Sequence, residues 1–152
     1  MSDPGPGQVL FRFVRHWARR AVAADAGGEQ GRLVLVCEAV HALSRRGSAA
    51  TVNAIAHEIG IDQSGASRLI KSAEAAGHLT TAAAAADSRR REASLTPDGR
   101  RMLDAAHRWQ ESVFAELTTE WSQEERIAFQ RAMTALMERS YAMGAPAKPT
   151  PR

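Results

Sequence analysis

Apolar positions repeat with the period of an α-helix along nearly the whole chain. A first stripe occupies residues 10–21 and ends in the glycine-rich stretch 25–31. A second stripe is formed by Leu33, Val36, Cys37, Val40 and Leu43, and it ends at Arg45-Arg46-Gly47. Spacings of three and four residues put apolar side chains on one helix face. The pattern therefore predicts two amphipathic helices in this part of the chain.

Capping residues predict where the next helices begin and end. Thr51 is placed to cap a short helix that runs to Gly60, and Asp62 is placed to cap a helix that ends at Gly77. A side-chain oxygen at the N-cap accepts an unpaired backbone N–H, and glycine adopts the conformation that ends a helix.

Residues 79–95 interrupt this helical pattern. The run Ala82–Ala86 has high helix propensity, but Thr80-Thr81 and Asp87-Ser88 flank it and no amphipathic face is present. We predict two short strands joined by a loop.

Helical signals return after this hairpin. Thr96 and Pro97 are an N-cap followed by proline at the first helical position, and Ser122 with Glu125 is a capping box for the last helix. The expected order is four helices, a hairpin and two helices. At 152 residues the chain fits one domain of a mainly α (α+β) fold.

Residues 52–71 have the pattern of a helix-turn-helix. Two crossed helices would be held together by Ile55, Ile59, Ile61, Ala66 and Leu69, with small Ala56 at their contact and Gly60 in the turn. Gly65 would let the backbone come close to DNA. The side chains predicted to contact DNA from these helices are Thr51, Asn53, Gln63, Ser64, Ser67, Arg68 and Lys71. An ordinary two-helix corner explains this pattern alone equally well.

Charge adds one feature to this pattern. The formal net charge of +3 is modest, but Arg89, Arg90 and Arg91 are consecutive within the predicted hairpin. Adjacent residues of an extended strand point to opposite sides, so the three cannot share one contact. A solvated loop is the alternative interpretation.

The hairpin resembles the wing of the MarR family of winged helix-turn-helix regulators. The resemblance rests on Asp87, Arg89, Leu95, Thr96 and Gly99 and extends from about residue 9 to 142. It implies that Arg89 enters the minor groove and that Asp87 braces the wing. Arg90 and Arg91 would then lie nearer the phosphates or the protein body. Ala73 stands where the family has a large aliphatic residue, which predicts looser packing of the recognition helix.

The same resemblance implies how the domain is organised. Residues 8–46 and 97–142 would be dimerisation helices and scaffold, residues 48–96 the DNA-binding lobe, and residues 1–7 and 144–152 flexible tails. The surplus apolar side chains outside the lobe are Trp17, Trp109, Trp121, Phe129 and Met137. The expected protein is a bacterial repressor that binds a pseudo-palindromic operator on double-stranded DNA as a homodimer.

A small aromatic or anionic effector is a further expectation from the resemblance. The residues that would line its pocket are Arg12, His16, Trp17, His41 and Trp109. Some relatives bind zinc, for which the candidates would be Cys37, His41, His107 and Glu111. We favour a structural cysteine and ordinary histidines, and hence no metal or cofactor.

Other function classes have little support. The chain lacks a phosphate-binding glycine loop, HExxH, CxxC and a nucleophile elbow, so an enzyme is not expected. A winged-helix protein-interaction module without specific DNA binding remains the alternative. A single cysteine, no signal-peptide pattern and no apolar run of about 18 residues predict a cytoplasmic protein without a membrane partner.

Overall fold

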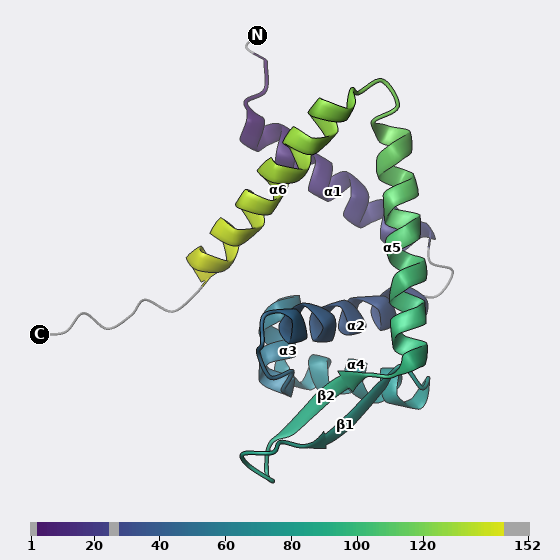
Figure 1. The fold of residues 1–152 in the computed structure, drawn as a ribbon, viewed down its shortest axis with the longest axis vertical. Helices are drawn as coiled ribbons and strands as arrows, with labels where there is room; N and C mark the ends of the chain where they lie inside the picture. The colour runs from purple at the N-terminus through teal and green to yellow at the C-terminus, as the bar shows by residue number, and fades with distance from the viewer. Residues whose placement is uncertain (1–2, 25–27, 145–152) are drawn as a thin grey trace, which may run out of the picture. The chain divides into compact units, whose positions relative to one another are not determined.

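A computed structural model describes residues 3–24 and 28–144 of the chain, within which the elements are six helices and one antiparallel hairpin (Figure 1). This element order confirms the expected mainly α fold. The elements are α1 Pro6–Ala24, α2 Glu29–Arg45, α3 Val52–Ile59, α4 Gln63–Ala75, β1 Leu79–Ala83, β2 Arg91–Leu95, α5 Pro97–Leu117 and α6 Gln123–Gly144.

The N-terminal helix starts earlier than the sequence pattern predicted. Residues 1–7 were expected to be a tail, but α1 already begins at Pro6. Proline suits the first helical position, because its ring fixes φ and the backbone N–H there has no partner within the helix. Of the C-terminal tail predicted at 144–152, Gly144 is the last residue of α6 and the rest lies outside the described residues.

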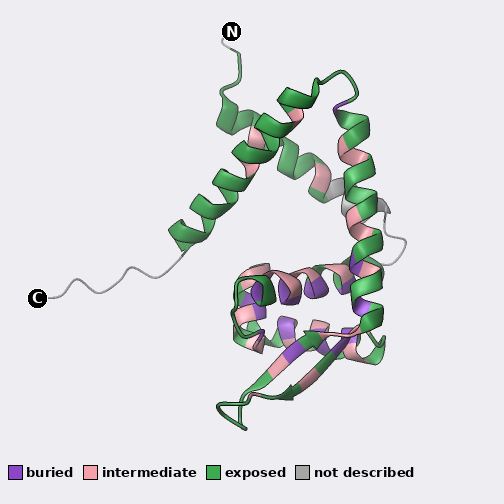
Figure 2. Ribbon diagram, in the orientation of Figure 1, coloured by how far each residue is buried: buried purple, intermediate pink, exposed green. Residues whose placement is uncertain are grey.

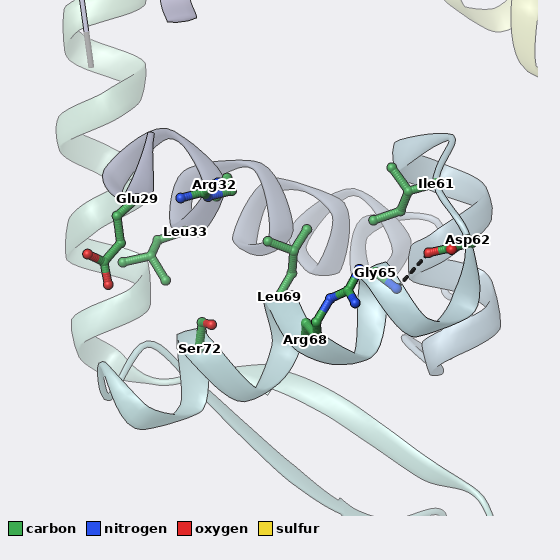
Figure 3. A pocket seen from close by; sticks show the side chains of 9 residues that line it. All are labelled: Glu29, Arg32, Leu33, Ile61, Asp62, Gly65, Arg68, Leu69 and Ser72. Atoms are coloured by element: carbon green, nitrogen blue, oxygen red, sulfur yellow. Dashed lines mark hydrogen bonds between the residues drawn. The ribbon is translucent and has the colours of Figure 1, made fainter. Parts of the chain in front are cut away.

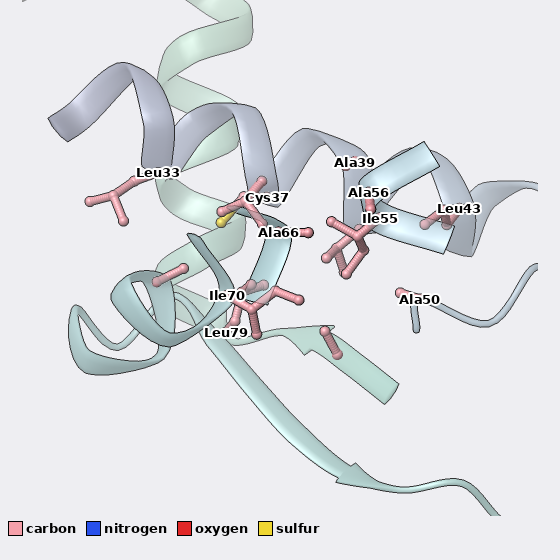
Figure 4. Close-up of a cluster of buried hydrophobic side chains, with 14 of the residues drawn as sticks. Leu33, Cys37, Ala39, Leu43, Ala50, Ile55, Ala56, Ala66, Ile70 and Leu79 are labelled. Carbon is pink, nitrogen blue, oxygen red and sulfur yellow. The ribbon is translucent and has the colours of Figure 1, made fainter. Parts of the chain in front are cut away.

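The chain divides into two compact units, residues 1–108 and 109–152, with the boundary inside α5. The first unit contains the hydrophobic core (Figures 2 and 4), and Ile55, Val36, Val40 and Cys37 are its largest fully buried side chains. All five apolar positions predicted for α2 are buried. The helical period of that segment therefore identified its core-facing side correctly.

Helix ends form as their capping residues predicted. The hydroxyl oxygen of Thr51 accepts the Ala54 N–H at 3.2 Å, and a carboxylate oxygen of Asp62 accepts the Gly65 N–H. Ser122 and Glu125 exchange hydrogen bonds of 3.2 and 2.7 Å, which is the expected capping box. Gly60, with φ of 80°, ends α3 in the left-handed conformation that glycine adopts at little cost.

The packing between α3 and α4 differs in detail from the prediction. Ile55 and Ala66 are fully buried, but Ile61 is 38% exposed. It lies in the turn before α4, whose buried face is Ala66, Ile70 and Ala73, at spacings of four and three residues. Ala73 has no exposed surface, so this small side chain lies inside the core. The looser packing expected at that position stays a prediction, because burial does not measure packing density.

The wing is a two-stranded antiparallel sheet, as predicted, with Leu79 paired to Leu95 and Ala83 to Arg91. Leu79 and Ala93 are buried at its base. The Ala93 N–H donates to the Ala50 carbonyl at 2.9 Å and joins the wing to the segment before α3. This pairing explains why the alanine run does not become helical.

The second unit contains the end of α5 and α6. The rings of Phe114 and Phe129 stack with centroids 5.6 Å apart, and the ring of Trp121 meets both edge-on. The Arg126 guanidinium donates to the Thr118 carbonyl at 2.7 Å. These contacts hold the loop between α5 and α6. Within the described part of the chain, no helix combines the length and apolar character needed to cross a membrane.

Candidate nucleic-acid interface

The side of α4 that faces away from the core is polar and basic. Gln63, Ser64, Arg68 and Lys71 are exposed, and Ser67 is half-buried. Their positions interleave with the buried Ala66, Ile70 and Ala73, so one helix serves both surfaces. Side chains of these types donate to and accept from base edges and phosphates. The geometry of α4 thus agrees with a recognition helix.

The start of α4 is built around Asp62. Its two carboxylate oxygens accept the Gly65 N–H at 2.6 Å and the Ser64 hydroxyl at 3.3 Å. A Cβ on residue 65 would lie 2.6 Å from the Asp62 carboxylate. The cap gives one physical reason for glycine at this position, and the close approach to DNA inferred from the sequence stays a prediction. Figure 3 shows this bond beside a hollow between α2 and α4 that Arg68 also lines.

Two of the predicted DNA-contacting residues lie at the start of α3. The hydroxyl of Thr51 caps α3 and the residue is half-buried, whereas Asn53 is exposed in the first turn. Only Asn53 therefore presents an uncommitted polar side chain at this end of the helix-turn-helix.

The tip of the wing is a tight turn held by Asp87. Its carboxylate accepts the Arg89 N–H at 3.0 Å, and its carbonyl accepts the Arg90 N–H at 3.0 Å. Asp87 thus braces the backbone of the turn, and Arg89 and Arg90 are exposed on it. Arg89 and Arg90 lie outside the strands. The alternation of side chains along an extended strand, from which different directions were predicted for the three arginines, therefore applies only to Arg91.

Arg91 is the first residue of β2, and its guanidinium folds back onto the wing. The same nitrogen, Nη2, donates to the Thr81 hydroxyl at 2.8 Å and to the Thr81 carbonyl at 3.0 Å. Of the two locations that the sequence left open for Arg91, the structure gives the one on the protein. Sequence spacing could not reveal this contact, because it depends on the register of the two strands.

A second polar cluster lies between α2 and the middle of α5. His107 and Glu38 are hydrogen-bonded at 2.6 Å, and the rings of His107 and His41 are 6.1 Å apart. They adjoin a cavity of about 460 Å³ lined by Val40, His41, Ser44, Ala93, Ser94, Leu95, Arg100, Leu103, Asp104 and His107.

Of the five residues predicted to form an effector pocket, only His41 lines this cavity. Arg12 and His16 are exposed on α1, Trp17 is half-buried there, and Trp109 belongs to the second unit. Nothing in the sequence pattern distinguished Glu38 or Arg100 as members of a site. Glu38 lies one helical turn before His41, which is the only local signal that could have drawn attention to it.

The suggested metal ligands do not assemble into a site. Among the residues that the structure describes, no group of three or more His, Cys, Asp or Glu side chains could hold a metal ion. His107 pairs with Glu38 rather than with Glu111. Cys37 is fully buried, and this burial, followed by the nearby charge of Glu38, raises the pKa of its thiol to about 11. A buried thiol that keeps its proton is a weak nucleophile, which favours a structural role for Cys37.

Cys37 is therefore expected to react slowly with a thiol reagent such as dithiobis-nitrobenzoate at pH 8, and rapidly once urea unfolds the chain. The free energy of unfolding should also fall between pH 9 and pH 11. The unfolded thiol loses its proton near its ordinary pKa of 9.0, whereas the native thiol keeps its proton up to about 11. This fall should be smaller in Cys37→Ala, measured by urea denaturation at both pH values. Rapid modification of the native protein would contradict the buried placement.

Comparison with known proteins identifies a matching family model and several solved structures with a similar fold. Residues 35–90 match the model of the MarR family. The structure is similar to that of MarR, with a TM-score of 0.68 and 18% identity over 94% of this chain and 96% of that one. It is similar to an S. aureus MepR–DNA complex, with a TM-score of 0.57 and 19% identity over 86% of this chain and 97% of that one.

A third similar structure is Bordetella bronchiseptica BpsR, whose DNA binding is regulated by 6-hydroxynicotinic acid. Its TM-score is 0.51 and its identity 22%, over 82% of this chain and 92% of that one. No curated protein matches the chain. The family match runs from within α2 to the wing tip, and the solved structures share the fold of nearly the whole chain. Residues 35–90 are thus similar to the MarR family, and the chain has the winged helix-turn-helix fold of these solved structures.

Proposed function

We propose that this protein is a DNA-binding transcriptional regulator that reads the major groove with α4 and reaches the minor groove with the tip of its wing. The observation that carries the proposal is the presence of two exposed basic surfaces in one compact unit, Arg68 and Lys71 on α4 and Arg89 and Arg90 on the wing. The MepR structure with DNA supports it. The similarity of residues 35–90 to the MarR family and the shared fold support a transcriptional regulator rather than an enzyme.

We propose that a second copy of the chain buries the exposed apolar surface of the terminal helices, α1 and α6. Within the described residues α6 has no buried side chain, and Leu136 is 51% exposed. Other large apolar side chains exposed on α1 and α6 are Phe11, Phe13, Val14, Met137 and Tyr141. Surface of this kind marks an interface in a protein that works in water. A two-fold dimer would present two recognition helices to a pseudo-palindromic operator and repress by occupying it.

The test combines sedimentation with operator selection from a random DNA library. At micromolar concentration the protein should sediment with twice the 16.4 kDa mass of one chain. Gln63→Ala and Arg68→Ala should each weaken binding to the selected operator by about 1–3 kcal/mol, with little change on random DNA. A well-folded monomer would contradict the dimer. Weak, unselective shifts with every fragment would instead favour a winged-helix protein-interaction module.

The cavity beside His107 is the proposed effector site. His41, Arg100 and His107 supply hydrogen-bond donors, and Val40 and Leu103 supply apolar surface, a combination that suits a small aromatic anion. The regulation of BpsR by 6-hydroxynicotinic acid supports this ligand class. Aromatic carboxylates should release the operator from the wild-type protein but not from Arg100→Ala. Equal release from both proteins would place the effector elsewhere.

A further inference from the structure

Three polar side chains link the recognition helix to both strands of the wing. Glu74 lies in the last turn of α4, Thr81 in the middle of β1 and Arg91 at the start of β2. The Thr81 hydroxyl donates to the Glu74 carboxylate at 2.7 Å and accepts from the Arg91 guanidinium at 2.8 Å. The guanidinium also donates to the Thr81 carbonyl at 3.0 Å. A continuous path of hydrogen bonds therefore runs from helix to strand to strand.

Strand register explains why these side chains meet. Thr81 pairs with Ala93 and Ala83 pairs with Arg91, so Arg91 is the diagonal neighbour of Thr81 on one face of the hairpin. A long side chain can span such a diagonal. Ala93, which shares this face, is buried. The three polar groups therefore lie on the side of the wing that faces the body of the unit.

The hydroxyl of Thr81 is the central element of this path. A hydroxyl has one proton to donate, and here it donates that proton to a carboxylate while it accepts from a cation. Each bond has a charged partner and is stronger than a bond between neutral groups. Bonds in such a series also polarise one another. Loss of this single hydroxyl would disconnect Arg91 from Glu74 without changing the net charge.

The wing needs such a connection because its outer part has little packing. Apart from half-buried Ala84, residues 82–90 are all exposed. An isolated two-stranded hairpin is marginally stable in water. At the base, the bond from Ala93 to Ala50 secures β2, and buried Leu79 secures the start of β1. The contact with Glu74 attaches the middle of β1 directly to the recognition helix.

We propose that Glu74, Thr81 and Arg91 form a strut that sets the direction of the wing relative to α4. Arg91 is then a positioning residue for DNA recognition and does not itself contact DNA, unlike the other two arginines of the run. The inference rests on the proposed function, because the strut matters for recognition only if α4 and the wing engage DNA together. Two contacts on one rigid body reinforce each other when their geometry fits both sites at once.

The test compares Thr81→Val with Thr80→Val. Valine keeps the shape and strand preference of threonine but removes its hydroxyl, and exposed Thr80 lies on the opposite face of the same strand. Thr81→Val should weaken binding to the selected operator about fivefold to tenfold, the effect of losing a charge-assisted hydrogen bond. Its salt dependence should stay unchanged, and Thr80→Val should bind as the wild type does.

Arg91→Ala separates positioning from direct contact. It should weaken operator binding to the same extent as Thr81→Val, and the double variant should lose no more than either single one. The slope of log affinity against log salt should match that of the wild type, whereas loss of a phosphate contact lowers it by about one. Additive losses with a reduced slope would overturn the proposal, and so would wild-type affinity in Thr81→Val.

A measurement without DNA separates this proposal from the proposed function. Amide hydrogen exchange of residues 79–95 should become severalfold faster in Thr81→Val and Arg91→Ala but not in Thr80→Val. If the wild type selects no operator, the proposed function fails, and the exchange rates still decide whether the strut orders the wing. Unchanged exchange in Thr81→Val would mean that the strut does not hold the wing.

Discussion

The substitution Gly99→Ala is expected to lower the free energy of unfolding by about 3 kcal/mol, at the upper end of the cost of forcing an extra methyl group into a packed site. Gly99 is buried in the first turn of α5, and a Cβ there would lie 2.1 Å from the His78 carbonyl oxygen. That carbonyl accepts the Thr96 N–H at 3.0 Å, so it is held in place and cannot easily move aside. The start of α5 would have to lift away from the turn after α4.

A matched control is Gly7→Ala in α1, where a new Cβ would meet no atom within 4 Å. This variant should be as stable as the wild type or slightly more stable, because alanine is the better helix former. Urea denaturation followed by circular dichroism gives both values. Wild-type stability of Gly99→Ala would show that α5 does not start against His78. Gly99 is also the last residue of the wing motif on which the resemblance to the MarR family rests. The contact with His78 gives a physical reason for glycine at that position of the motif.

The substitution Arg89→Ala is expected to weaken operator binding by tenfold or more without lowering the melting temperature. Its backbone N–H is held by Asp87 while its side chain is exposed on the wing tip, so folding depends little on the guanidinium. A guanidinium in a narrow A/T-rich minor groove gains from the concentrated negative potential there. The variant should therefore also lose its preference for A/T-rich flanking sequence, measured by fluorescence anisotropy with paired operators.

Arg90→Ala is the control for Arg89→Ala, because it removes an equal charge from the same turn. It should cost less affinity and leave the preference for A/T-rich flanks intact. Loss of the Arg89 contact should also lower the salt slope by about one. Wild-type affinity of Arg89→Ala at physiological salt would show that the wing tip does not enter the groove.

The sequence by itself determined the local structure of this protein. Thr51, Asp62 and the pair Ser122–Glu125 cap the helices as predicted, because a cap joins groups only two or three residues apart. The helical period identified the buried side of α2. The threonine and aspartate flanks of the alanine run correctly indicated strands and a turn instead of a helix. The wing motif that begins at Asp87 and Arg89 could also be located, because its residues stand at fixed distances along the chain.

Tertiary structure decided which of these residues act together. Glu38 and His107 are 69 positions apart, and their bond depends on how α2 lies against the middle of α5. Ile61 turned out exposed because it lies in the turn before α4, while Ile70 is buried on the side of α4 that meets the core. Arg91 was separated from the other two arginines by strand register, which brought it to Thr81. Contacts across the fold depend on how elements pack and pair, and the period of any one segment does not contain that information.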